Sequence, residues 1–177
     1  MFCSIEEYLG RNAQAYYDVL AAVGRGSWHP EHDARPWIRF CLNAHYQQAR
    51  TVAWRISAAE ELWDRCEKLA QGRGLPARVT GPLCDAAQGL RLRNAVYRNA
   101  IAQSEGQEIS EQVASLDLRR LVTSGLLDAR GETRGRFYLG SPVLRREWQE
   151  VRSTRPKPEQ LDLFADSAEQ LRLITGP

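Results

Sequence analysis

The chain has no long apolar run and no closely spaced pair of cysteines. No segment is apolar for the roughly 18 residues that a membrane-spanning helix needs, and the first residues lack the basic and then apolar regions of a signal peptide. Its four cysteines include no CxxC pair, which favours reduced thiols packed as small apolar side chains. We therefore expect a soluble protein of the bacterial cytoplasm.

The chain also has little excess charge. Its 24 lysine and arginine residues stand against 22 acidic ones, for a net charge of +2, and only Lys68 and Lys157 are lysines. Such a balance does not require a nucleic-acid partner, so an argument for one depends on how the arginines are arranged. With 43% hydrophobic residues in 177, the chain is long enough for one large domain or two small ones.

Helical patterns dominate the first 74 residues. Ser4 followed by Glu7 has the spacing of a capping box, and apolar residues then predict a helix over residues 5–23. A second helical stretch is predicted over residues 34–71, with a break near the polar run at residues 57–61. We expect a mainly α protein that begins with a helical bundle segment.

Shorter elements follow, and we expect residues 75–152 to form a second domain, with residues 153–177 as a partly disordered tail. The predicted order is three helices, two strands around a glycine-bounded turn, and a closing helix: residues 82–88, 93–102, 110–124, 126–130, 136–139 and 142–152. Three helices followed by a β-hairpin indicate a winged helix-turn-helix.

The third of these helices has two faces when it is plotted at 100° per residue. Four of its residues point to the core: Ala114, Leu118, Leu121 and Val122. The other side carries the residues that would enter a DNA major groove: Gln112, Leu116, Arg119, Arg120 and Thr123. Three arginines of the hairpin are candidates for phosphate contacts: Arg130, Arg134 and Arg136. Three more flank the second helix: Arg91, Arg93 and Arg98.

Other features of this surface favour a protein partner instead of double-stranded DNA. Leu116 is apolar, and four acidic residues dilute the positive charge: Glu111, Asp117, Asp128 and Glu132. Winged helices also serve as regulatory protein contacts, so both partners stay open at this stage.

Two stretches resemble parts of Fic-family proteins. The residues Ala15-Tyr16-Tyr17-Asp18-Val19-Leu20, followed by Arg35-Pro36-Trp37-Ile38-Arg39-Phe40, resemble the late helices of the Fic domain, where a "YY..L" helix precedes a "W..F" helix. Residues 109–122 with Gly125-Leu126-Leu127 resemble the winged helix that follows in many Fic proteins, and also the recognition helix of DeoR-type regulators. The resemblance covers about residues 1–140.

Fic proteins transfer AMP or a related group to protein hydroxyls through a loop of the form HPFxxGNGR. That loop is missing, because His29-Pro30-Glu31-His32-Asp33 has neither the Phe nor the Gly-Asn. The resemblance therefore implies a non-catalytic C-terminal region of a Fic-like protein, without cofactor, whose winged helix binds DNA or a regulatory partner. The alternative is a fragment of a Fic AMP-transferase that is active only with the missing catalytic segment.

Two short groups of residues suggest other partners. After the stiff spacer at residues 155–158, five residues resemble the peptide by which bacterial proteins dock on the sliding clamp: Gln160, Leu161, Asp162, Leu163 and Phe164. The same residues also suit a tail that packs on its own domain. Donors for zinc occur at His29, His32, Asp33, Cys41 and His45, but they form no closed four-ligand pattern, and we expect no metal.

Overall fold

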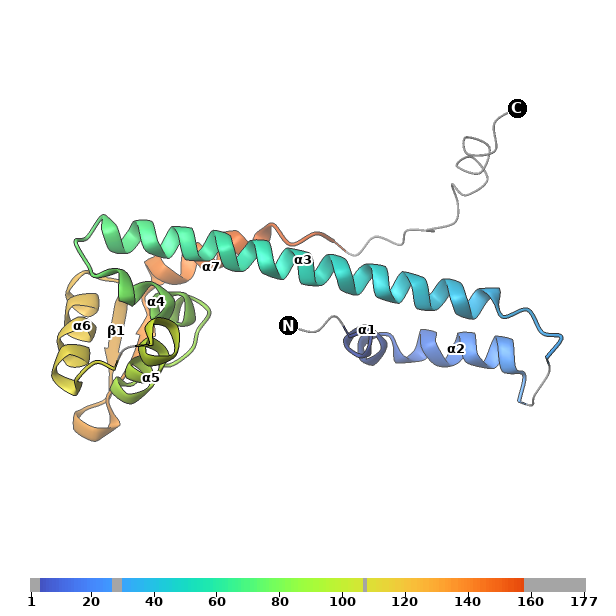
Figure 1. Ribbon diagram of the computed structural model, residues 1–177, viewed down its shortest axis with the longest axis horizontal. Helices are drawn as coiled ribbons and strands as arrows, with labels where there is room; N and C mark the ends of the chain where they lie inside the picture. Colours follow the sequence, from blue (N-terminus) through green and yellow to red (C-terminus); the bar gives the residue numbers. More distant parts are fainter. Residues whose placement is uncertain (1–3, 27–29, 107, 158–177) are drawn as a thin grey trace, which may run out of the picture. The chain divides into compact units, whose positions relative to one another are not determined.

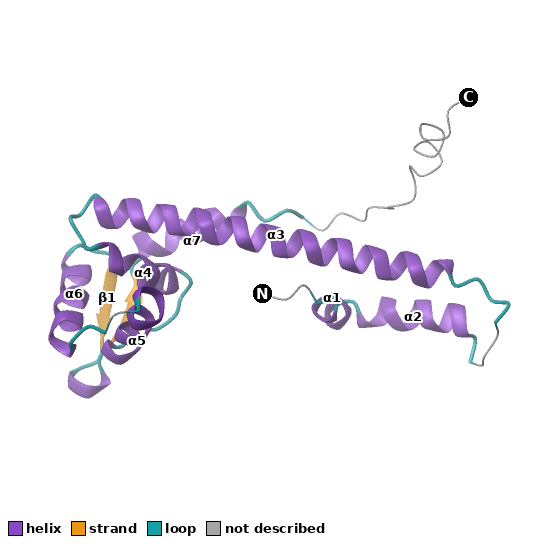
Figure 2. Cartoon of the chain, in the orientation of Figure 1, coloured by secondary structure: helices purple, strands orange, loops and turns teal. Residues whose placement is uncertain are grey.

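The computed structural model describes residues 4–26, 30–106 and 108–157. It is mainly helical, with one small antiparallel sheet (Figure 2), which confirms the predicted fold class at this level. No helix within those ranges combines the length and the apolar character that crossing a membrane requires.

The chain divides into two compact units: an N-terminal unit (residues 1–55 with 156–177) and a central unit (residues 56–155). The division between the units falls inside one continuous helix, α3 (Arg35–Gln71), and the boundary expected at residue 74 lies just after the end of that helix. The predicted break near residues 57–61 is therefore wrong. Alanine and glutamate in that run are good helix formers, and no glycine or proline follows Pro36 before Gly72.

The N-terminal unit holds α1 (Glu6–Arg11), α2 (Ala13–Gly24) and the first part of α3 (Figure 1). The single helix expected over residues 5–23 is interrupted at Asn12, whose backbone (φ −126°, ψ 35°) departs from helical values and whose side-chain amide donates to the Tyr8 carbonyl at 2.8 Å. The expected capping box is also absent. Ser4 accepts from the Glu6 N–H at 3.2 Å, while the Glu7 carboxylate accepts from Arg55 at 2.9 Å.

Aromatic rings fill most of the space between the helices of this unit. Tyr8 of α1 meets Phe40 edge to face, and Tyr16 of α2 meets Trp37 in the same way at 5.6 Å between centroids. These rings are only half-buried, and neither α1 nor α2 has a buried residue. The N-terminal unit therefore has little core of its own.

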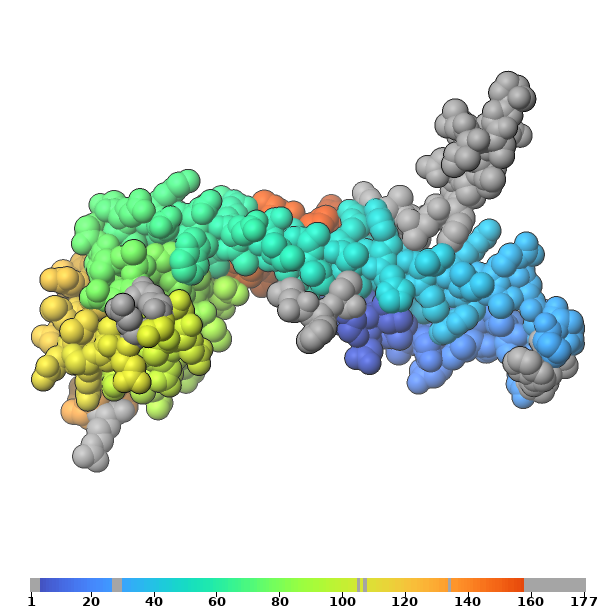
Figure 3. Space-filling view, viewed as in Figure 1, coloured from blue at the N-terminus to red at the C-terminus, as the bar shows by residue number. Residues whose placement is uncertain are grey.

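The central unit contains the end of α3 and then the following elements: η1 (Ala77–Val79), α4 (Thr80–Ala87), α5 (Asn94–Glu105), α6 (Glu111–Thr123), β1 (Leu127–Arg130), η2 (Thr133–Gly135), β2 (Phe137–Gly140) and α7 (Pro142–Ser153). The side chains of α4, α5 and α6 pack closely against one another (Figure 3, green to yellow). Fully buried leucines come from α3, α4, α6, β1 and α7, and burying each contributes about 1.5–3 kcal/mol.

The sheet is built from more than the predicted hairpin. β1 and β2 pair antiparallel, with Leu127 opposite Gly140 and Arg130 opposite Phe137. In addition Leu92, between α4 and α5, exchanges both backbone hydrogen bonds with Tyr138 at 2.8 and 2.9 Å. This bridge joins the segment before α5 to the free edge of β2.

One glycine allows β2 to lie against α4. A Cβ on Gly140 would lie 2.5 Å from the Ala86 carbonyl oxygen, far inside van der Waals contact. Any other residue there would push the sheet away from α4, so Gly140 is required by close approach of two backbones. α7 begins directly afterwards, where the Ser141 hydroxyl accepts from the Leu144 N–H and Pro142 occupies the first turn.

Candidate nucleic-acid interface

The outer face of α6 is the centre of the candidate site. On the inner side Ala114, Leu118 and Leu121 are fully buried, as the helical periodicity predicts. All five residues of the predicted reading face are exposed: Gln112, Leu116, Arg119, Arg120 and Thr123. The helix therefore presents two guanidinium groups, an amide and a hydroxyl to solvent.

The same face carries more apolar surface than the sequence analysis counted. Val113 is 37% exposed and Leu116 45% exposed, and their spacing of three residues places them side by side on the helix. Val113 was missed because it lies at the edge between the two faces in a helical plot.

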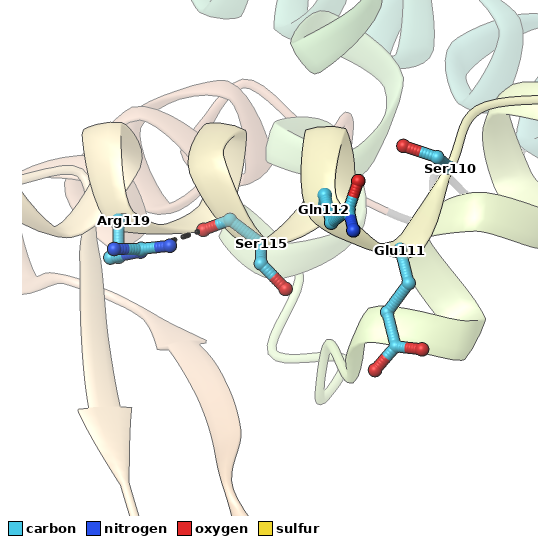
Figure 4. A pocket seen from close by; sticks show the side chains of 5 residues that line it. All are labelled: Ser110, Glu111, Gln112, Ser115 and Arg119. Atoms are coloured by element: carbon cyan, nitrogen blue, oxygen red, sulfur yellow. Dashed lines mark hydrogen bonds between the residues drawn. The ribbon is translucent and has the colours of Figure 1, made fainter.

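An open depression lies at the start of this face. Ser110, Glu111, Gln112, Ser115 and Arg119 line it (Figure 4). Arg119 extends along the helix toward the Ser115 carbonyl at 3.4 Å, a weak contact from which it is easily released (Figure 4). The depression thus combines one cation, one anion and two hydroxyls, a lining suited to polar contacts rather than to an apolar ligand.

The sequence placed Asp117 among four acidic residues expected to dilute the positive charge of this surface. In the structure Asp117 is buried and is not part of that surface. Its side chain is fully buried and accepts two hydrogen bonds from the Arg78 guanidinium, at 2.7 and 2.9 Å. The buried Tyr97 hydroxyl donates to it as well, at 2.9 Å. Burial, and then the Asp117 charge, raise the pKa of Tyr97 well above its usual range, so this phenol stays protonated as the donor.

Polar contacts to neighbouring segments hold α6 in place. Ser110 caps the helix by accepting from the Val113 N–H, and the Asn94 amide donates to the Ser115 hydroxyl at 2.8 Å. Arg73 donates to the Ser124 carbonyl at 3.2 Å, at the C-terminal end of α6 where cations stabilise a helix. These contacts fix the orientation of the outer face.

Arg98 also serves the scaffold instead of the surface. Its guanidinium donates to the Ile109 carbonyl at 3.1 Å and so ties α5 to the segment that leads into α6. Its position on the second predicted helix suggested a surface arginine, because a single sequence cannot show which carbonyl an arginine reaches.

Arginines gather around the small sheet. Arg91, Arg93, Arg130 and Arg136 are all exposed, and no ion pair with a described residue is found for any of them. All four lie on the segments that make up the sheet, because Arg91 and Arg93 flank Leu92, which pairs with Tyr138, and Arg130 pairs with Phe137. We call these four residues the sheet arginines.

Two of the sheet arginines lie over aromatic rings of β2. The Arg91 guanidinium is 5.1 Å from the centre of the Phe137 ring, and Arg136 is 5.8 Å from that of Tyr138. Such contacts hold the side chains in place while their donors face solvent. The side chain of Arg134, the third predicted hairpin contact, lies outside the described part of the structure.

The other candidate sites are dispersed or lie beyond the described ranges. Within those ranges no three His, Cys, Asp or Glu side chains are grouped to hold a metal ion. His32 contacts the Val23 carbonyl at 2.9 Å, and Asp33 accepts from the backbone N–H of Arg35 at the start of α3. His29 and the clamp-like residues Gln160–Phe164 lie outside the described residues.

Comparison with known proteins adds no relative. No family model, no curated protein and no solved structure matches this chain.

Proposed function

We propose that the elements from α4 to β2 form a winged helix that binds double-stranded DNA, with α6 in the major groove and the sheet arginines on the phosphates. The observation that carries this proposal is the division of charge on α6. Its two outward arginines are exposed, whereas its central acid, Asp117, is buried and neutralised by Arg78. The face offered to a partner is therefore more positive than the sequence alone indicates.

The order of elements supports the same proposal. A recognition helix that follows a first helix across a short connection is the helix-turn-helix arrangement, and here α5 and α6 are so joined. The hairpin follows α6 directly, and the Leu92–Tyr138 bridge ties it to the segment before α5. This bridge gives the hairpin a fixed position relative to α6.

Each exposed side chain of α6 suits a particular contact. Gln112 and Arg119 carry amide and guanidinium donors that pair with adenine and guanine edges, and Thr123 and Leu116 offer methyl groups for thymine. Arg120 lies beside this row on the helix and suits a phosphate oxygen. The sheet arginines suit phosphates too, because backbone contacts position a protein without reading sequence.

The proposal is tested by fluorescence anisotropy of a labelled mixed-sequence duplex titrated with the full chain at several salt concentrations. Replacing Arg119 and Arg120 together by alanine is expected to weaken binding roughly 10-fold or more at low salt. Because Arg120 is the proposed phosphate contact of the two, the slope of log K against log salt should fall by about 1 in magnitude.

The matched control is the pair Arg145→Ala and Arg146→Ala. These two exposed arginines are also adjacent in the chain but belong to α7, outside the proposed interface. Their removal should leave the salt slope nearly unchanged. Equal losses from both double variants would mean a diffuse charge effect, and no binding of the unaltered chain at low salt would overturn the proposal in favour of protein contact through Val113 and Leu116.

The weak core of the N-terminal unit favours a second role, docking of partner helices. Its aromatic rings are half-buried, and Tyr17 is 63% exposed, as expected of helices that complete a larger bundle. In the Fic-like alternative the partner is a segment with the HPFxxGNGR loop. Adding such a segment and measuring AMP transfer from ATP to protein tests it, and no transfer above that of the segment alone would count against it.

A further inference from the structure

Two free cysteines of the central unit come together in the fold although 18 positions separate them in the chain. Cys66 lies on α3 and is fully buried, and Cys84 lies on α4 and is partly exposed. The Cys84 thiol is 3.9 Å from the Leu62 carbonyl, one helical turn before Cys66 on the same face of α3. This position also places the Cys84 thiol beside the Cys66 thiol, within reach of a hydrogen bond between the two sulfur atoms. They therefore form a pair and not two isolated thiols.

The surroundings make the two thiols unequal. The hydrogen bond with Cys66 lowers the pKa of Cys84 despite partial burial and the nearby Asp85 carboxylate, so Cys84 is the readier thiolate. The same hydrogen bond and burial raise the pKa of Cys66 far above its usual range, so Cys66 keeps its proton and donates. Cys84, the partly exposed thiol, is thus the more nucleophilic one, and the buried Cys66 thiol lies next to it.

We propose that Cys66 and Cys84 form an oxidisable dithiol site, which a hydroperoxide converts to a disulfide between α3 and α4. Cys84 is the thiol that meets the oxidant, and Cys66 is the thiol that resolves the product. This proposal does not depend on DNA binding.

Oxidation of the two thiols to a disulfide takes two steps. The Cys84 thiolate attacks one oxygen of the hydroperoxide, the O–O bond breaks, and the product is a sulfenic acid plus an alkoxide that takes a proton from water. The Cys66 sulfur then attacks the Cys84 sulfur, the S–O bond breaks, and the hydroxyl leaves as water with the Cys66 proton. Two thiols lose two electrons, and the peroxide bond gains them.

Cys41 is a natural comparison. It is also a free and partly exposed thiol, on the first part of α3, and burial raises its pKa. Within the described residues no second cysteine contacts it, so oxidation there has no resolving thiol at hand. The contrast predicts that only the Cys66–Cys84 pair forms an intramolecular bond.

The test treats the full chain with hydrogen peroxide, alkylates the remaining thiols and digests without reduction. Trypsin should release Cys66–Lys68 and Val79–Arg91 as one disulfide-linked peptide, two hydrogen atoms lighter than the sum of the free peptides. Its formation should raise the Tm by at least about 5 °C, because the bond closes a loop that the unfolded chain would otherwise leave open, and a reductant should reverse the shift.

Serine variants separate the two roles. Cys66→Ser should accumulate a sulfenic acid on Cys84 that a dimedone reagent traps, whereas Cys84→Ser should give neither trapped product nor linked peptide. Cys41→Ser, the control, should form the linked peptide at the wild-type rate. Trapping of the sulfenic acid on Cys66 instead of Cys84 would reverse the assignment of the two roles. In the wild-type chain, overoxidation of Cys84 without formation of the linked peptide would overturn the proposal.

Discussion

The central unit and the N-terminal unit differ in what lies between their helices. In the central unit, leucines from α4, α6 and β1 are fully buried, and a buried carboxylate is matched by an arginine and a phenol. In the N-terminal unit only Ala44 and Gln48 are buried among the described residues. Half-buried rings and the ion pair between Glu7 and Arg55 supply the other contacts.

This contrast separates two sources of order in one chain. Burial of apolar area stabilises a fold in proportion to the area removed from water, and the central unit removes far more. Ion pairs that water still reaches contribute little. We therefore expect the central unit to hold its surface rigidly, whereas the N-terminal unit opens at a lower free energy and is completed when a partner covers it.

The largest expected effect comes from breaking the buried carboxylate contact of the central unit. Asp117→Ala removes the partner of Arg78 and Tyr97 and is expected to lower the free energy of unfolding by about 3 kcal/mol, since a buried polar group without a partner is costly. Urea unfolding followed by circular dichroism measures the loss.

Glu111→Ala is the matched control, because Glu111 is an exposed acid on the same helix. Its effect should stay within about 0.5 kcal/mol. Similar effects of the two variants would mean that the buried network does not stabilise the central unit.

Hydrogen exchange compares the two units directly. Backbone amides of α1 and α2 should exchange at least about 100-fold faster, relative to their intrinsic rates, than those in the middle of α6, because local opening exposes little apolar surface in the N-terminal unit. Mass spectrometry of pepsin fragments gives the rates. Equal protection in α2 and α6 would show that the N-terminal unit is as stable as the central one.

The smallest effect is the response of the N-terminal unit to acid. The Arg55 guanidinium, with Gln48 and Arg11, lowers the pKa of Glu7 from 4.5 to about 2. The folded state therefore binds this proton less readily than the unfolded state, so the stabilisation is complete above pH 4.5 and is lost as the pH falls toward 2. Hydrogen exchange in α1 should accelerate across this window.

Glu7→Gln should abolish that part of the acceleration, because a glutamine does not titrate. Asp33 titrates in the same region, since hydrogen bonds from Arg35 lower its pKa from 3.8 to about 2, and Asp33→Asn identifies its share. An acid response of α1 that is identical in the wild-type chain and in Glu7→Gln would exclude the Glu7–Arg55 pair as its cause.

Periodicity predicted the elements of the central unit well. The helices and strands expected between residues 82 and 152 are present with ends shifted by at most three residues, and every residue that the 100° plot places on the outer face of α6 is exposed. The length of α3 was harder to predict, because the polar run at residues 57–61 suggests the end of a helix. The alanines and glutamates of that run are nevertheless good helix formers. The interruption at Asn12 is a local change of backbone conformation at a residue that is neither glycine nor proline, and the helical pattern did not predict it.

Several contacts around the candidate site join residues that are far apart in the chain, and the sequence did not predict them. Asp117 and Arg119 both read as surface charges, yet Arg78, 39 residues away along the chain, meets only the first. The Leu92–Tyr138 bridge and the Cys66–Cys84 pair likewise join segments that no local pattern connects.

The sequence by itself determined the mainly helical class, the order of the short elements in the central unit and the outward face of α6, because these follow from local periodicity, helix caps and turn residues. Only the tertiary structure decided which charges are neutralised, which segment pairs with the free edge of β2 and which thiols are neighbours. The physical reason is that pairing depends on distances across the fold, and these are set by how the core packs rather than by spacing along the chain.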